Sequence, residues 1–126
     1  MDCESAKKNG KTWFIDIDGV IFEHNGYLYS KESNHEIPLP GVLSFFQSLD
    51  CNDKVILCTA RKESFRQNTE ASLLATGIRY DLLLMNLPTG KRIIINDKKD
   101  DGMQTAFAVN VKRNSGIKKS IKRLIE

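Results

Sequence analysis

The segment WFIDIDGVIF, residues 13–22, decides how this sequence is interpreted. With the two residues before it, its first part makes a short apolar run that ends in a carboxylate at Asp16, which predicts a buried β-strand over residues 11–16. Asp18 and Gly19 follow, and then a second apolar run, VIF. An ionisable side chain between two apolar runs is costly to bury without a partner. The pattern therefore indicates a functional site rather than a plain turn.

Four more apolar runs along the chain predict strands that follow the first one. They are KVILC, YDLLLM, RIII and AFAVNV, at residues 54–58, 80–85, 92–95 and 106–111. Continuous apolar runs of this kind are typical of parallel strands that are buried on both faces. The sequence therefore predicts a mainly parallel five-stranded sheet.

Helices are predicted between these strands, which makes the chain an α/β protein. One begins near Pro40 and covers residues 41–49, a second covers 63–76 and ends at Gly77, and a last one follows the fifth strand. Tyr27–Tyr29, between turn-forming residues, predicts one arm of a small β-hairpin flap. At 126 residues, the chain has the length of a single domain over 1–126.

Polar groups follow three of the predicted strands at the point where each strand ends. These groups are DIDG at 16–19, CTAR at 58–61 and NDKKDDG at 96–102. Ligands of open α/β sheets bind beyond the carboxyl ends of the strands. The sequence therefore predicts one site to which all three segments contribute.

The chemistry that suits these residues is phosphoryl transfer through an aspartyl phosphate. Asp16 is the expected nucleophile, and it shares a hard cation such as Mg2+ with Asp97. Asp18 is placed to protonate the leaving oxygen and then to deprotonate the attacking water. Thr59 is expected to donate a hydrogen bond to a phosphoryl oxygen, and a lysine is expected to neutralise charge there. Arg61 either contacts the substrate phosphate or pairs with an acid.

Three motifs in this order resemble those of the haloacid-dehalogenase-like phosphatases. WFIDIDGVIF is similar to their DxDG[VT] motif, VILCTAR to their Thr/Ser motif, and IIINDKKDDG to their later acidic motif. The resemblance implies a Rossmann-like three-layer sandwich, Mg2+, Asp16 as nucleophile and Asp18 as acid and base. It implies metal ligation by Asp16, Asp97 and the Asp18 main-chain carbonyl, and substrate binding by Thr59, Ala60 and Arg61.

The lysine of that family's remaining motif has no obvious counterpart. Lys91 starts the predicted strand that ends near Asp97, so five or six residues of about 3.3 Å each place it roughly 17–20 Å from the site. Lys98 and Lys99 lie just past the strand end, and we assign the role to Lys99, then Lys98, then Lys91. Asp100 and Asp101 are open as metal ligands or turn residues, and Asp101 is alternatively a group that holds the lysine.

The spacing of the motifs leaves no room for a cap domain, so the site is expected to be open. Closure then requires a partner subunit, such as a second copy of the chain, or a large substrate. The favoured substrate is a phosphorylated sugar or glycan precursor, hydrolysed as a phosphate monoester. One alternative substrate is the 3′-phosphate end of a nucleic acid. A different alternative is a receiver-like or binding module that does not turn over a substrate.

Charge and hydropathy limit the kinds of partner that the protein can have. The net charge of +3 comes from the last fifteen residues, where six basic residues and one acid predict a docking helix with a solvated basic face. A nucleic-acid patch is the second interpretation of that segment. No apolar run approaches the roughly 20 residues of a membrane span, and the polar N-terminus does not resemble a secretory signal, so a cytoplasmic location without membrane contact is expected.

Overall fold

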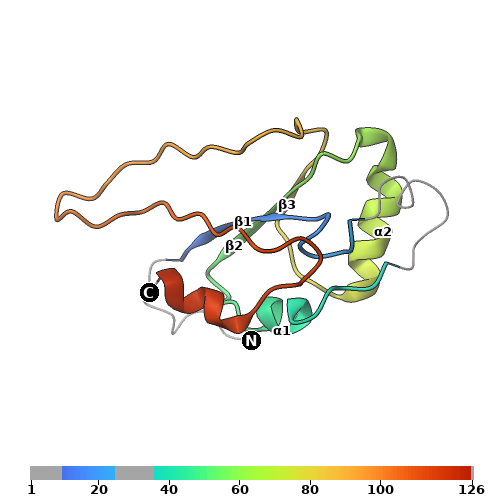
Figure 1. The fold of residues 1–126 in the computed structure, drawn as a ribbon, viewed down its shortest axis with the longest axis horizontal. Coiled ribbons are helices and arrows are strands. Elements are labelled where there is room, and N and C mark those ends of the chain that lie inside the picture. Colours follow the sequence, from blue (N-terminus) through green and yellow to red (C-terminus); the bar gives the residue numbers. More distant parts are fainter. Residues whose placement is uncertain (1–9, 25–35, 126) are drawn as a thin grey trace.

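The computed structural model describes residues 10–24 and 36–125 and has a parallel sheet at its centre. Its strands are β1 (Thr12–Asp16), β2 (Lys54–Cys58) and β3 (Leu82–Leu84), in the order β1-β2-β3 (Figure 1). In the register, Phe14 lies beside Ile56 and Ile56 beside Leu82. This arrangement confirms an α/β protein with a parallel sheet and is compatible with a Rossmann-like fold.

Two helices connect the strands and are close to the predicted positions. The first, α1 (Val42–Gln47), starts after Gly41, whose φ of 79° suits glycine. The second, α2 (Arg66–Thr76), follows the short 3-10 helix η2 (Glu63–Phe65) and ends at Gly77 with φ 73°, as predicted. Both connections step in the same direction along the sheet, and right-handed crossovers of this kind put both helices on one face.

The hydrophobic core lies on that face of the sheet. Its largest contributors are apolar side chains of the strands, of both helices and of the loop after β1, with Ile117 from the C-terminal part. On the other face, Phe14 is 54% exposed, Leu82 49% and Leu84 37%. The three-layer sandwich is therefore not confirmed, because these side chains of the second face stay exposed in the part of the chain that the structure describes.

The predicted fourth and fifth strands do not form. Residues 92–95 and 106–111 instead belong to an extended arm, residues 88–112, which projects from the body in Figure 1. Ile93 and Ile95 are 79% and 94% exposed in it. An apolar run becomes a strand only when a neighbouring backbone accepts its hydrogen bonds, and pairing is not encoded in the run itself. The sheet therefore has three strands in the described chain, and the predicted five strands are not confirmed.

The C-terminal segment forms a 3-10 helix, η3 (Lys119–Ile125), where an α-helix was predicted. Ile117 is buried at 4% exposure and Ile121 packs against the core, whereas Leu124 is 65% exposed. The apolar side of the segment thus docks through its first half.

The predicted hairpin flap at Tyr27–Tyr29 lies outside the described residues. In the part of the chain that is described, no helix has the length and apolar character to cross a bilayer.

Candidate functional site

The carboxyl ends of the strands form one rim, as the parallel register requires. Asp16 lies beside Cys58, and Cys58 beside Leu84, so all three strands end at the same level. Thr59 continues this alignment, because its backbone N–H donates to the Leu84 carbonyl oxygen at 2.9 Å. The predicted site residues at this rim are those of the first two motifs: Asp16, Asp18, Thr59, Ala60 and Arg61.

A tight loop after β1 presents the two aspartates. The Ile17 carbonyl oxygen accepts hydrogen bonds from the N–H groups of Ile21 at 2.9 Å and Phe22 at 3.1 Å. Ile17 and Ile21 are fully buried, whereas the side chains of Asp16 and Asp18 keep 41% and 15% exposure. The buried isoleucines therefore anchor the loop, which leaves the Asp16 carboxylate half-exposed and the Asp18 carboxylate largely buried against Arg61.

Arg61 is a buried cation that holds two carboxylates. Its side chain has 0% exposure, and its Nη2 lies 2.9 Å from Asp18 Oδ1 and 2.6 Å from Glu36 Oε1. Its Nε donates to Asp18 Oδ2 at 3.1 Å, and its Nη1 donates to Thr69 Oγ1 at 3.1 Å. Its Cζ also lies 5.9 Å from the ring centroid of Phe22. Of the two predicted roles for Arg61, the structure shows the pairing with an acid, and both Asp18 and Glu36 take part in it.

The electrostatics of Arg61 follow from this network. Burial by itself would lower the pKa of the guanidinium, but the hydrogen bonds to Asp18 and Glu36 outweigh it and raise the pKa above its ordinary value. Arg61 is therefore permanently charged. It fixes the position of the Asp18 carboxylate, which is the group expected to move protons.

Asp16 has a cationic neighbour that the sequence did not indicate. Arg92, at the base of the arm, places its Nη1 3.2 Å from Asp16 Oδ1. The Ile17 backbone N–H donates to the same oxygen at 2.9 Å. Asp16 is thus held in one orientation by a backbone donor and a half-exposed guanidinium.

Thr59 is fully buried and is fixed by backbone bonds on both sides. Its Oγ1 accepts from the Arg61 backbone N–H at 3.0 Å. Its carbonyl oxygen accepts from the Leu87 N–H at 3.1 Å, and the Arg61 carbonyl accepts from the N–H of Asn86, which has a φ of 64°. The hydroxyl has an acceptor role in this arrangement and keeps its own hydrogen for donation.

Cys58 lies beside Asp16 in the register and is buried in the strand β2. Burial is the main cause that raises the pKa of its thiol. Arg92 acts in the opposite direction and lowers this pKa, whereas Asp16 raises it.

A hollow of about 270 Å³ lies elsewhere, between α1 and the end of α2, and is lined by side chains such as Phe46 and Ile78. Because it contains none of the rim residues, it does not belong to this site.

The third predicted segment is not at the rim. Asp97 and the lysines of the arm are exposed, and the Lys99 N–H donates to the Met103 carbonyl in the turn at the tip. Asp101 Oδ1 accepts from the Met103 N–H at 2.9 Å, which is the turn role. The placement of Lys91 at the far end of the sheet was wrong, because its neighbour Arg92 contacts Asp16. The cause is the missing fourth strand, which would have carried residues 92–97 along the sheet.

The expected metal ligands are only partly assembled. Asp16 and Asp18 share the rim, but the described residues include no group of three or more His, Cys, Asp or Glu side chains that could hold a metal ion. The Asp18 carboxylate is engaged by Arg61, and the Asp16 carboxylate by Arg92. In this arrangement the described residues do not assemble the complete Mg2+ site that the motifs imply.

Glu36 and Arg92 are the contributors to this site that sequence reasoning missed. Glu36 precedes Ile37 and Pro38, and its side chain is only 8% exposed. The signal for Glu36 was a carboxylate at the end of the loop that follows the DxDG motif. It stands directly before Ile37, which Pro38 keeps in an extended conformation. For Arg92 the signal was a cation at the start of RIII, a run that was instead interpreted as a strand.

The sequence matches no protein-family model, and no curated protein matches it. Solved structures do match. A chain of the Pnkp1/Rnl/Hen1 complex is similar with 26% identity and a TM-score of 0.51, over 74% of this chain and 33% of that chain. A chain of the Pnkp1/Rnl/Hen1 RNA repair complex is similar with 25% identity and a TM-score of 0.51, over 73% of this chain and 30% of that one.

These similarities concern a part of the larger proteins, since this chain spans about a third of their length. They cover most of the present chain, and they agree with a small α/β unit that has a parallel sheet. They are compatible with the resemblance to haloacid-dehalogenase-like phosphatases that the motifs indicate.

Proposed function

We propose that this chain is a phosphomonoesterase of the haloacid-dehalogenase-like type, with Asp16 as its nucleophile. The observation that carries the proposal is the convergence of Asp16, Asp18 and Thr59 at one rim, with Asp18 held by the buried Arg61. A strand end and a tight loop, rather than a long side chain, position both carboxylates. Such rigid placement suits a nucleophile and a proton-transfer group that must act on the same phosphate.

The reaction would proceed in two displacements. An oxygen of Asp16 attacks phosphorus, the P–O bond to the leaving group breaks, and the leaving oxygen takes a proton from Asp18. Water then attacks the aspartyl phosphate and gives a proton to Asp18, which releases inorganic phosphate and regenerates Asp16. Thr59 would donate its hydroxyl hydrogen to a non-bridging oxygen.

Arg92 supports the binding step of this proposal. Its guanidinium already lies at the nucleophile and is 40% exposed, so it can turn from Asp16 to an incoming phosphate. A guanidinium is suited to this because its fork of donors matches phosphate oxygens. We propose that Arg92, rather than Lys99, Lys98 or Lys91, neutralises the phosphate in this arrangement.

Mg2+ remains part of the proposal through the motifs and the chemistry of the carboxylates. A dianionic phosphate and two carboxylates repel one another, and a hard cation would offset that repulsion. Asp16 and the main-chain carbonyl of Asp18 are the groups at the rim that would bind it. Asp97 is the further ligand that the motifs imply.

The substrate class is open between two kinds of phosphate ester. A phosphorylated sugar fits the small open rim, where Asp16 is 41% exposed. The comparisons favour the second candidate, a nucleic-acid end that carries a phosphate, because the similar chains belong to an RNA repair complex. Those chains also belong to an assembly, which supports our proposal that a partner covers the rim here too.

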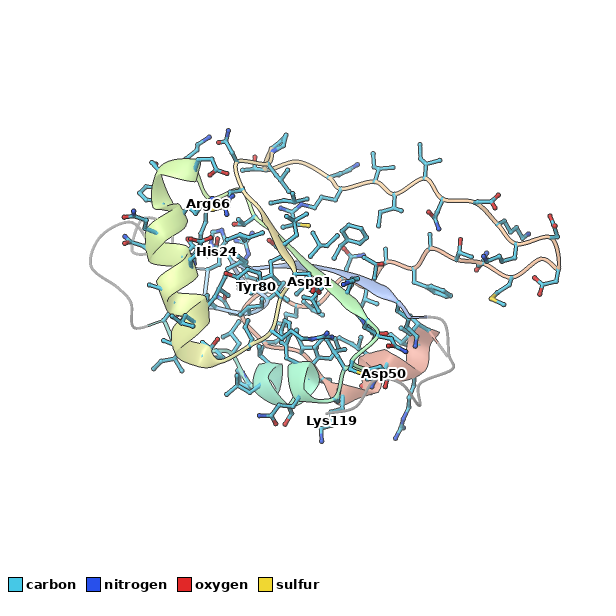
Figure 2. All side chains as sticks on the ribbon, turned by 180° about the vertical axis from the view of Figure 1, so that it is seen from behind. His24, Asp50, Arg66, Tyr80, Asp81 and Lys119 are labelled. Atoms are coloured by element: carbon cyan, nitrogen blue, oxygen red, sulfur yellow. The ribbon has the colours of Figure 1, made fainter. Side chains whose placement is uncertain are left out.

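Turnover of p-nitrophenyl phosphate tests the mechanism. We expect phosphate release from the wild type with Mg2+, none above background in EDTA, and none from Asp16→Asn. Asp50→Asn is the matched control, because it makes the same carboxylate-to-amide change at an exposed position on the α1 side of the molecule (Figure 2). Equal rates from the wild type and Asp16→Asn would refute the mechanism, and would leave a receiver-like or binding module as the better account.

A further inference from the structure

A turn from the C-terminal part of the chain is docked on the loop that carries the DxDG motif. The Asn114 backbone N–H donates to the Gly19 carbonyl oxygen at 2.9 Å, and Asn114 Oδ1 accepts from the His24 N–H at 2.7 Å. Arg113 packs so closely on Gly19 that a Cβ there would lie 3.2 Å from its Cγ. Two residues that are more than ninety positions from Gly19 in sequence thus border the site.

The chain beyond this turn is clamped to the body by its backbone. The Ile117 N–H donates to the Pro40 carbonyl oxygen at 3.1 Å, and the Ile117 side chain is 4% exposed. A Cβ on Gly116 would come within 1.9 Å of the Pro40 oxygen, and a Cβ on Gly41 within 2.1 Å of the Ile117 oxygen. Two glycines therefore permit a close approach of backbones that fixes the segment without using its charges.

The segment that is held in this way, residues 112–123, is called here the basic segment. It contains six cations and no acid: Lys112, Arg113, Lys118, Lys119, Lys122 and Arg123. Lys122 Nζ donates to the Ser48 carbonyl oxygen at 2.8 Å. The other five are exposed, and none of them forms a salt bridge with another described residue.

The cations of the basic segment repel one another, and the described acids do not offset that repulsion. A cluster of one sign raises the local concentration of oppositely charged ligands. The first residues of the segment lie next to Gly19, beside the rim. From there the segment continues to η3 on the α1 side of the sheet, where Figure 2 shows Lys119 (Figures 1 and 2). It is therefore a positive path that starts at the site and leads away from it.

We propose that the basic segment binds the phosphodiester backbone of a nucleic-acid strand whose terminal phosphate is at Asp16. The proposal rests on the proposed phosphatase function and names its substrate class. Among the cations of the basic segment, a small phosphorylated sugar at the rim would be close only to Arg113 and its neighbour Lys112. The cations of the 118–123 part are used only by an extended polyanion, which a nucleic-acid strand provides at regular spacing.

Binding of a single-stranded RNA of about 12 nucleotides with a 3′-phosphate tests this path. Fluorescence anisotropy in EDTA measures Kd without turnover. The test variant is Lys118→Gln/Lys119→Gln, because both side chains are exposed and neither forms a salt bridge or a side-chain hydrogen bond with another described residue. Each lost phosphate contact costs about 5-fold in affinity at 0.1 M salt, and we expect the slope of log K against log salt to become shallower by about 0.7 per contact. The double variant should thus bind roughly 25-fold more weakly.

The matched control is Lys11→Gln/Lys54→Gln, which makes the same change in net charge directly before β1 and at the first residue of β2, at the end of these strands that lies away from the rim. We expect it to change Kd by less than about 2-fold, since it removes no contact. Both double variants should hydrolyse p-nitrophenyl phosphate at the wild-type rate, because neither touches the rim.

Three results would overturn the proposal. They are equal Kd changes in the two double variants, wild-type RNA binding weaker than about 0.1 mM, and binding to phosphatidylserine vesicles without binding to the RNA. Failure of the phosphatase function has a different signature. It would leave the difference in Kd between the two variants intact while no protein releases phosphate from any ester.

Discussion

Replacing Arg61 by Met removes the guanidinium that Asp18 and Glu36 share, while it keeps a long apolar side chain in the same space. The two carboxylates are only 15% and 8% exposed, so solvent cannot replace the lost partner. Removing one partner of a buried ion pair costs about 3–5 kcal/mol, because an uncompensated charge stays behind. We expect Arg61→Met to lower the free energy of unfolding by this amount.

The expected change in melting temperature follows from the size of the chain. For 126 residues, an unfolding entropy of about 2.1 cal/mol/K per residue gives about 0.26 kcal/mol/K. A loss of about 3–5 kcal/mol then lowers Tm by roughly 11–19 °C. Circular dichroism during heating and urea titration of the same samples measure Tm and the free energy of unfolding.

Arg66→Met is the matched control, because Arg66 also contacts two carboxylates. It lies 2.8 Å from Glu63 and 3.4 Å from Glu70, but those side chains are 56% and 46% exposed. Exposed pairs contribute about 0–1 kcal/mol. The triple change Arg61→Met with Asp18→Asn and Glu36→Gln should recover part of the stability, since it removes the stranded charges. If Arg61→Met costs no more than Arg66→Met, the burial argument is refuted.

Two further predictions concern the neighbours of β1. Asp53, 3% exposed, accepts hydrogen bonds from the Lys11 N–H and from Trp13 Nε1, both at 2.9 Å. Asp53→Ala should therefore cost about 1–3 kcal/mol in urea unfolding and change the emission of Trp13, whereas Asp53→Asn should keep most of the stability. The pKa of Cys58 is raised, chiefly by burial, so its contribution to stability is complete below the unfolded pKa and is lost as pH rises through the folded pKa. Compared with Cys58→Ala, the wild type should lose stability above about pH 8.5 in pH-dependent urea titrations, and equal slopes for the two proteins would contradict this.

Much of the candidate site is local in sequence, which is why it could be predicted. The strand that ends at Asp16, the turn at Gly19 and the pair Thr59-Ala60 after β2 are properties of short segments. The rule that parallel strands end at one edge then brings the first two motifs together. Their meeting at one rim is confirmed, whereas the chemical roles of these residues stay predictions.

The sequence by itself determined which segments are apolar, where helices stop and which carboxylates follow a strand, because periodicity and glycine act over a few residues. Only the tertiary structure decided that residues 92–95 pair with none of the described strands and belong to an extended arm, and that Phe14, Leu82 and Leu84 stay exposed on one face of the sheet. It also decided that Arg61 joins Asp18 to Glu36, and that Asn114 docks on Gly19. Strand pairing, ion pairs and backbone docking depend on which distant residues meet, and no local pattern specifies that.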